Sequence, residues 1–259
     1  MHANIVKIHK TIVLLLFFIY LILFYIFVLL FSSMELDIRI KMNEKLYLKN
    51  PEQSIIGKKI VSEGLKLINQ LGFENFTFKK LAQEIETTEA SIYRYFENKH
   101  RLLVYLITWY WSFLEYKIII NTQHISDPKS KLKAIIKLLV TEPEIHKGEL
   151  EYLSEKEASQ LLKWEGSKAY LTRNVNNDNK DQLFKPFKDI CKRISSHILD
   201  LNPNYKFPNS LATTLLEMSH AQKFFMENLP ALSESKKSKN KHLIDFLEDL
   251  VFKSIEQVK

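Results

Sequence analysis

Two short amphipathic segments lie between two long ones, and this arrangement constrains the fold more than any other feature of the sequence. In the segment after Thr77, apolar residues recur at the i, i+3, i+4, i+7 spacing of one helix face, namely at Phe78, Leu81, Ala82 and Ile85. The next segment, which Thr87 or Thr88 can cap, carries Ile92 and Phe96 on its inward face. The pattern predicts two short helices joined by a tight turn.

The segments on either side carry the signals of longer helices. Asn50–Pro51 is typical of a helix start, because Asn caps the first turn and Pro at the first helical position loses no hydrogen bond. Apolar residues recur at helical spacing up to Leu71, where Gly72 favours an end, and a second long helix is predicted after Asn98. Further helices are predicted near residues 128–141, 154–173, 182–200, 209–229 and 240–258. Residues 174–180 are expected to form the connection between the second and third of these helices.

Composition supports an all-α fold. The 259 residues include only 5 glycines and 7 prolines, and a hydrophobic content of 46% is sufficient for a core. Cys191 is the single cysteine, which excludes an intrachain disulfide and a cysteine-based zinc site and fits a reducing cytoplasm. The net charge of +7 permits attraction to nucleic acid or to an anionic membrane without choosing between them.

Two short helices with this spacing are suited to a helix-turn-helix. In that motif the first helix braces a second one, whose amino-terminal end enters the major groove of DNA. Here the apolar face of the first helix, together with Ile92 and Phe96, would seat the pair on one core, with Glu86–Thr87 as the turn. The outward residues of the second helix would then be available to DNA.

These residues also resemble a known family. The agreement extends from Ile55 to about Ile107 and is carried by Gly72-Phe73, Phe76-Thr77, Leu81-Ala82, the run from Ser91 to Lys99, and Leu102-Leu103. The stretch resembles the DNA-binding domain of the TetR family of transcriptional regulators. One position departs from the family pattern, because the turn residue that is often Gly is Glu86 here. The turn must therefore form without the freedom of glycine, and it brings a negative charge near DNA.

The resemblance implies a set of DNA-binding residues. Thr77, Tyr93 and Lys99 would hold the phosphate backbone. The residues expected to meet bases or nearby phosphates are Thr88, Glu89, Ala90, Ser91, Arg94 and Tyr95. For each residue the alternative is a structural role: Thr77 would only cap its helix, Tyr93 and Tyr95 would only pack, and Lys99 would only be solvated.

The resemblance also implies an organisation in two domains: a three-helix DNA-binding domain over residues 51–101 and a helical effector-binding and dimerisation domain over residues 102–259. A homodimer would place two readers about one DNA turn apart, at ~34 Å, on a palindromic operator. Apolar residues of the last two long helices are expected to form the dimer interface, namely Leu211, Leu215, Met218, Phe225, Phe246 and Leu250. Aromatic residues expected to line an effector pocket are Trp109, Phe113, Tyr116 and Trp164.

Residues 1–33 form an apolar amino-terminal segment, followed by an expected linker over residues 34–50. From Thr11 to Phe31 there is no charged residue, and 21 residues of helix would span about 31 Å, enough for a bilayer core. The segment is therefore either a transmembrane anchor or a mis-assigned start, with the protein beginning at Met34 or Met42. An inner-membrane anchor would leave the DNA-binding body in the cytoplasm of a bacterial cell.

The sequence does not favour an enzyme. The 8 histidines show no paired metal-ligand spacing, and neither a glycine-rich phosphate loop nor a nucleophile elbow is present. We therefore expect no catalytic residues, no metal and no cofactor. The predicted function is a sequence-specific regulator that binds double-stranded DNA, usually a repressor by analogy with the family, and is released by a small effector. The alternatives are a membrane-tethered DNA-binding sensor and a helical interaction module that does not bind DNA.

Overall fold

The computed structural model describes residues 16, 17, 19–25, 40–141, 152–234 and 239–256, and it divides the chain into two units. One unit comprises Met1–Ile38 and His146–Glu151. Its described residues, 16, 17 and 19–25, are helical with exposed side chains. Residues 11–15, 18 and 26–31 of the predicted apolar segment lie outside the described residues. Residues 34–39 of the predicted linker 34–50 also lie outside them.

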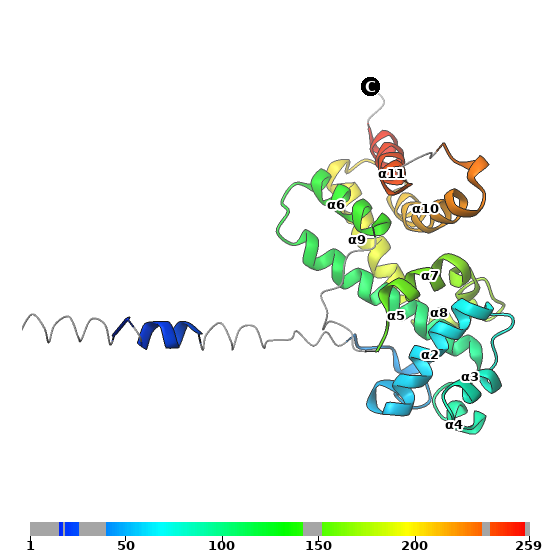
Figure 1. Cartoon of the computed structure of the whole chain (residues 1–259). Coiled ribbons are helices and arrows are strands. Elements are labelled where there is room, and N and C mark those ends of the chain that lie inside the picture. The colour runs from blue at the N-terminus through cyan, green and yellow to red at the C-terminus, as the bar shows by residue number, and fades with distance from the viewer. Residues whose placement is uncertain (1–15, 18, 26–39, 142–151, 235–238, 257–259) are drawn as a thin grey trace, which may run out of the picture. The chain divides into compact units, whose positions relative to one another are not determined.

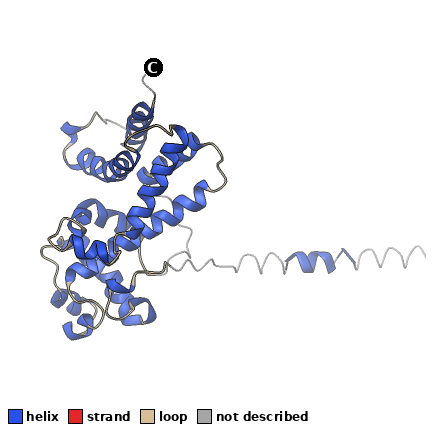
Figure 2. Ribbon diagram, turned by 180° about the vertical axis from the view of Figure 1, so that it is seen from behind, coloured by secondary structure: helices blue, strands red, loops and turns tan. Residues whose placement is uncertain are grey.

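The other unit, Arg39–Ile145 with Tyr152–Lys259, is built from helices, and the described residues contain no strand (Figures 1 and 2). The all-α prediction is therefore confirmed. The α-helices of this unit are α2 (Ile55–Leu71), α3 (Phe78–Glu84), α4 (Glu89–Tyr93), α5 (Lys99–Thr122), α6 (Pro128–Val140), α7 (Glu155–Glu165), α8 (Val175–Lys180), α9 (Lys185–Leu201), α10 (Pro208–Asn228) and α11 (Lys239–Ile255). Short 3-10 helices are η1 (Glu44–Leu46), η2 (Pro51–Gln53), η3 (Gly166–Ala169) and η4 (Pro230–Leu232).

The first long helix begins slightly later than the sequence predicts. Asn50 does cap a turn, since its side chain accepts the amide of Glu52, but that turn is the 3-10 helix η2. The α-helix starts after Ser54, whose hydroxyl accepts the amide of Gly57 at 3.1 Å. Gly72 ends α2 with a φ of 74°, as expected for a residue that needs glycine's conformational freedom.

Helix α5 forms the centre of this unit. In the part of the chain that the structure describes, it is the one helix long and apolar enough to cross a membrane, but 72% of its most apolar window is buried inside the protein. It contacts α2 at one end and α6, α7 and α9 along its length. Trp109 and Phe113 stack in the core with ring centroids 5.6 Å apart. We therefore interpret α5 as a core helix.

Two predicted boundaries in the body are wrong. The helix expected over residues 154–173 ends at Glu165 and continues only as η3, while residues 174–180, expected between helices, contain α8. The spacing of apolar residues continues beyond Glu165, the last residue of α7, because Ala169 of η3 is also buried.

Residues 40–50 lie against the amino-terminal helices instead of forming a free linker. Leu46 is fully buried, and the amide of Leu48 donates to the carbonyl of Tyr95 at 2.8 Å. At the other end of this unit, α9 packs on α6 and α10, and α10 packs on α11 (Figure 1).

Candidate nucleic-acid interface

Helices α3 and α4 form the predicted helix-turn-helix, and both begin at the expected caps. The hydroxyl of Thr77 accepts the amide of Lys80 at 3.2 Å, and that of Thr88 accepts the amide of Ser91 at 3.2 Å. The apolar residues predicted to face inward are all buried, namely Phe78, Leu81, Ala82, Ile85, Ile92 and Phe96. The sequence pattern therefore placed the inner face of the motif correctly.

The turn between α3 and α4 has a left-handed residue at Glu86, the position at which the related family often has glycine. Glu86 has a φ of 55°, in the left-handed region that L-residues other than Gly, Asn and Asp seldom adopt. The amide of Thr87 donates to the carbonyl of Ala82 at 2.8 Å, which closes the turn. The chain thus reaches the glycine-like conformation with a glutamate, whose exposed side chain leaves the core unaffected.

Helix α4 presents a mixed polar and aromatic face to solvent. Among the residues predicted to bind DNA, those with exposed side chains are Thr77, Thr88, Glu89, Ala90, Tyr93 and Arg94, while Ser91 is half-buried. Tyr93 is 48% exposed, and its ring packs edge-on against Phe78 with a centroid distance of 5.1 Å. Its hydroxyl end is thus available at the surface while the ring is held by the core.

Tyr95 does not belong to this face. Its side chain is only 4% exposed, and its hydroxyl lies 2.7 Å from the hydroxyl of Ser54, so the expectation that it meets DNA is wrong. The reason is geometric: α4 ends at Tyr93, and the chain then turns inward to bring Tyr95 and Phe96 onto the core. The structural alternative considered for Tyr95 from the sequence is the one observed.

Lys99, expected to hold a phosphate, contacts the protein backbone. Its ammonium donates to the carbonyls of Phe73, Glu74 and Phe76 at 2.9, 3.1 and 3.1 Å. It also lies 4.7 Å from the centroid of the Phe73 ring. An ammonium has three N–H groups, so these three bonds use its full donor capacity. Lys99 therefore organises the turn between α2 and α3.

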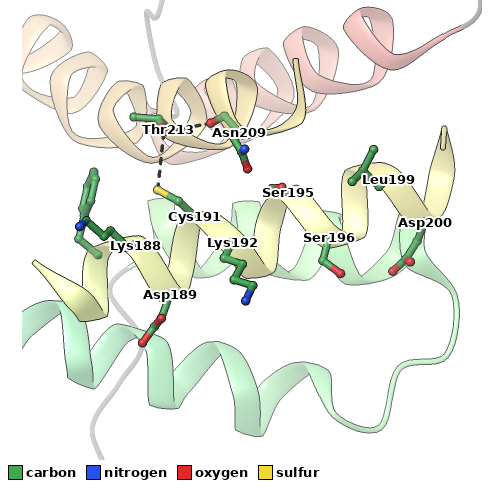
Figure 3. A pocket seen from close by; sticks show the side chains of 11 residues that line it. Lys188, Asp189, Cys191, Lys192, Ser195, Ser196, Leu199, Asp200, Asn209 and Thr213 are labelled. Carbon is green, nitrogen blue, oxygen red and sulfur yellow. Dashed lines mark hydrogen bonds between the residues drawn. The ribbon is translucent and has the colours of Figure 1, made fainter. Parts of the chain in front are cut away.

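The four aromatic residues expected to line an effector pocket do not form one together. Trp109 and Phe113 are fully buried, Tyr116 is half-buried, and Trp164 is 49% exposed and packs against Phe224. A groove of about 740 Å³ lies instead along α9 and the start of α10 (Figure 3). None of the four aromatic residues is among the described residues that line it.

The groove has a mixed chemical character. Its lining includes Lys192, Asp189, Ser195 and the single cysteine, Cys191. The hydroxyl of Thr213 donates to the Cys191 sulfur across the groove (Figure 3). Burial raises the pKa of the Cys191 thiol above its usual value, so the neutral thiol is the form present at neutral pH.

The residues expected at a dimer interface divide into two groups. Leu211 and Leu215 are buried within their own chain. Met218, Phe225 and Leu250 are half-buried, and Phe246 is 41% exposed. Only the second group remains available as an outward apolar surface of α10 and α11.

Two buried acids that contact residues of the amino-terminal half could not be identified from the sequence. Glu165 accepts the amide of Phe73 at 3.0 Å, and Asp178 accepts the Arg101 guanidinium at 3.0 Å. Each lies more than 75 positions from its partner in the chain. Local spacing carries no signal for such contacts.

Comparisons with known proteins agree with this geometry. Residues 60–106, which include both helices of the motif, match the family model described as bacterial regulatory proteins, tetR family. No curated protein matches the chain significantly.

Several solved structures have a similar fold. The crystal structure of AibR in complex with isovaleryl coenzyme A and operator DNA is 14% identical, covering 75% of this chain and 98% of AibR at a TM-score of 0.53. The fatty acid degradation regulator FadR from Bacillus halodurans is 16% identical, with coverages of 74% and 96% and a TM-score of 0.51. A transcriptional regulator from Rhodococcus sp. Rha1 is 13% identical, with coverages of 79% and 95% and a TM-score of 0.51. Residues 60–106 are therefore similar to the DNA-binding domain of the bacterial tetR family, and the fold over most of the chain is similar to that of these solved structures.

Proposed function

We propose that the protein is a sequence-specific repressor that binds a palindromic operator as a homodimer and is released by a small effector. The observation that carries this proposal is the exposed face of α4, with Thr88, Glu89, Tyr93 and Arg94, beside the exposed Thr77 at the start of α3. The proposed domains are residues 51–101 for DNA binding and 102–259 for effector binding and dimerisation.

Each outward residue is given a role by its chemistry. The Thr77 oxygen already accepts an amide, which leaves its hydroxyl proton to donate to a phosphate at the helix amino terminus. Arg94 is suited to donate to guanine, and Glu89 to accept from cytosine. Tyr93 would hold the backbone through its hydroxyl, while Ala90 and Ser91 allow close approach to the groove. Lys99 supports this set indirectly, through the α2–α3 turn.

A dimer is proposed through α10 and α11. Their outward apolar residues Met218, Phe225, Phe246 and Leu250 are suited to pack with a second copy as a four-helix interface. A single reader of this size makes few phosphate contacts, so useful affinity needs two readers on a two-fold site. The activity would take place in the cytoplasm, where the DNA is.

Effector control is proposed by analogy. The similar structure of AibR was obtained with both isovaleryl coenzyme A and operator DNA, so a similar fold accommodates both kinds of ligand. In this chain the groove along α9 is the candidate effector site, since it is a hollow in the surface of the proposed effector domain.

The test is selection of genomic DNA fragments by the purified full chain, followed by sequencing and a mobility-shift competition. Enrichment of a short palindrome supports the proposal. Sedimentation of the complex then gives the number of chains on each site, with two expected. If the folded protein enriches no sequence, a helical interaction module without DNA binding replaces the proposal.

A second candidate is the same regulator tethered to a membrane. Its support is that the described residues 16, 17 and 19–25 are helical, apolar and exposed. Fractionation of cells that express the chain from its first codon tests it: recovery in the membrane fraction after a high-salt wash supports the tether, and recovery in the soluble fraction contradicts it.

A further inference from the structure

The carboxylate of Glu165 contacts the turn between α2 and α3, directly before the helix-turn-helix. Glu165 is the last residue of α7 and is only 7% exposed. Its Oε1 accepts the amide of Phe73 at 3.0 Å, and its Oε2 lies 2.8 Å from the ammonium of Lys168. Lys168 also lies 3.1 Å from the carboxylate of Glu74, the next residue of the same turn. Glu165 and Lys168 thus contact the α2–α3 turn at two points, the amide of Phe73 and the carboxylate of Glu74.

The turn also has local hydrogen bonds, from the amide of Phe76 to the carbonyl of Gly72 at 3.1 Å and from the Asn75 side chain to the carbonyl of Leu71 at 3.1 Å. Gly72, with its φ of 74°, rotates the Phe73 amide out of helix α2, so this N–H cannot continue the helical hydrogen-bond pattern. Lys99 holds the carbonyls of Phe73, Glu74 and Phe76. The turn is therefore fixed from two sides, by a cation of α5 on its carbonyls and by an anion of α7 on its amide.

This turn determines where α3 begins. Phe76 is fully buried and directly precedes Thr77, whose hydroxyl caps α3. A displacement of residues 73–76 would therefore move the amino terminus of α3, and with it Thr77 and the packed helix α4. An amide held by a buried carboxylate resists such displacement, because a charged acceptor makes a stronger hydrogen bond than a neutral one.

We propose that Glu165 is the positioning residue through which the body fixes the orientation of the helix-turn-helix, and that loss of its bond to Phe73 converts the reader to a low-affinity state. This inference rests on the proposed DNA-binding function and adds a route for its regulation. The end of α7 is suited to that role, because it is followed at once by the short helix η3 that carries Lys168.

The first test does not require DNA. Hydrogen exchange is measured by mass spectrometry on the full chain in detergent micelles, in peptides that cover residues 72–84. Glu165→Asp, with a shorter side chain that cannot reach Phe73, should exchange about tenfold faster there, since a hydrogen bond to a charged group is lost. Glu165→Gln keeps an acceptor oxygen but loses the charge, so its exchange rate should lie between those of the wild type and Glu165→Asp. Glu227→Gln is the matched control. Glu227 lies on α10 and forms an ion pair with Lys163 of α7, so this change also removes a carboxylate that contacts α7 but leaves the bond to Phe73 intact.

The second test uses the palindrome that the wild type selects. Glu165→Asp should bind it about tenfold more weakly, whereas Glu165→Gln and Glu227→Gln should bind within about threefold of the wild type. Unchanged exchange in Glu165→Asp, or equal loss of affinity in the Asp and Gln variants, would overturn the inference. If the wild type selects no DNA, the proposed function fails, while the exchange result still decides whether Glu165 fixes the turn.

Discussion

The ammonium of Lys99 lies 2.9 Å from the carbonyl oxygen of Phe73, and this bond joins the first residue of α5 to the turn between α2 and α3. With two further carbonyls it uses all three donors of the side chain. A residue that resembles a phosphate contact in sequence therefore has a structural role in the free protein.

We expect Lys99→Met to destabilise the protein instead of weakening phosphate contact. Three carbonyls lose their charged donor, so the free energy of unfolding should fall by about 2 kcal/mol. The slope of log Kd against log salt concentration should remain that of the wild type, because no counterion is released at this position. Urea unfolding and salt titrations of DNA binding measure the two effects. A flatter slope with unchanged stability would assign Lys99 to phosphate.

Glu86→Gly should stabilise the protein. The native φ of 55° is strained for glutamate and natural for glycine, so relief of strain outweighs the larger entropy of the unfolded chain, by about 1 kcal/mol. Glu84→Gly is the matched control, since it places glycine in the last turn of α3 and should destabilise by about 1 kcal/mol. Denaturant unfolding of both variants measures this difference in sign; a loss of stability in both would show that the strain at Glu86 is negligible.

Asp178→Ala should be among the more damaging single changes in the body. Asp178 is 2% exposed and pairs with Arg101 at 3.0 Å, so its removal leaves a partly buried guanidinium without its acceptor and should cost about 3 kcal/mol. Asp181→Ala removes a more exposed carboxylate, 4.0 Å from Lys45, and should cost less than about 1 kcal/mol. Equal melting temperatures for the two variants would contradict this assignment.

His220 should make stability depend on pH in the mildly acidic range. Burial, with a smaller contribution from Lys223, lowers the pKa of His220 to about 3. As pH falls below the unfolded value of about 6.5, the unfolded chain binds a proton that the folded protein does not, so stability is present above this pH and is lost below it. Between pH 7.5 and pH 5 the loss should be about 2 kcal/mol.

The variant that tests this dependence is His220→Phe. The imidazole packs edge-on to Tyr110 and Trp111, which a phenyl ring can also do. The variant should lose most of the pH dependence between pH 7.5 and pH 5 in urea unfolding, whereas the same change at the exposed His124 should keep it. A His220→Phe curve parallel to that of the wild type would show that other groups carry the effect.

The amino-terminal helices could be predicted because their signals are local. Thr77, Thr88 and Asn98 cap helices as expected, and the apolar residues of α3 are buried. The conformation at Glu86 also follows from position, since the turn needs a left-handed residue whichever side chain occupies it.

The rest of the site depends on tertiary contacts that spacing does not reveal. Tyr95 lies beyond the end of α4 and is turned inward to Ser54, 41 positions away. Lys99 and Glu165 meet at the same turn although they lie on different helices. A single sequence gives the residue types on each helix face but not which distant groups approach them.

The central claim is that the exposed face of α4 reads DNA, and selection of genomic fragments by the full chain tests it most directly. We predict that the wild type enriches one short palindrome and that a Tyr93→Phe, Arg94→Ala double variant, which keeps the ring on Phe78 and should keep the melting temperature, enriches none. Enrichment of the same palindrome by the folded double variant, or of no sequence by the wild type, would contradict the claim.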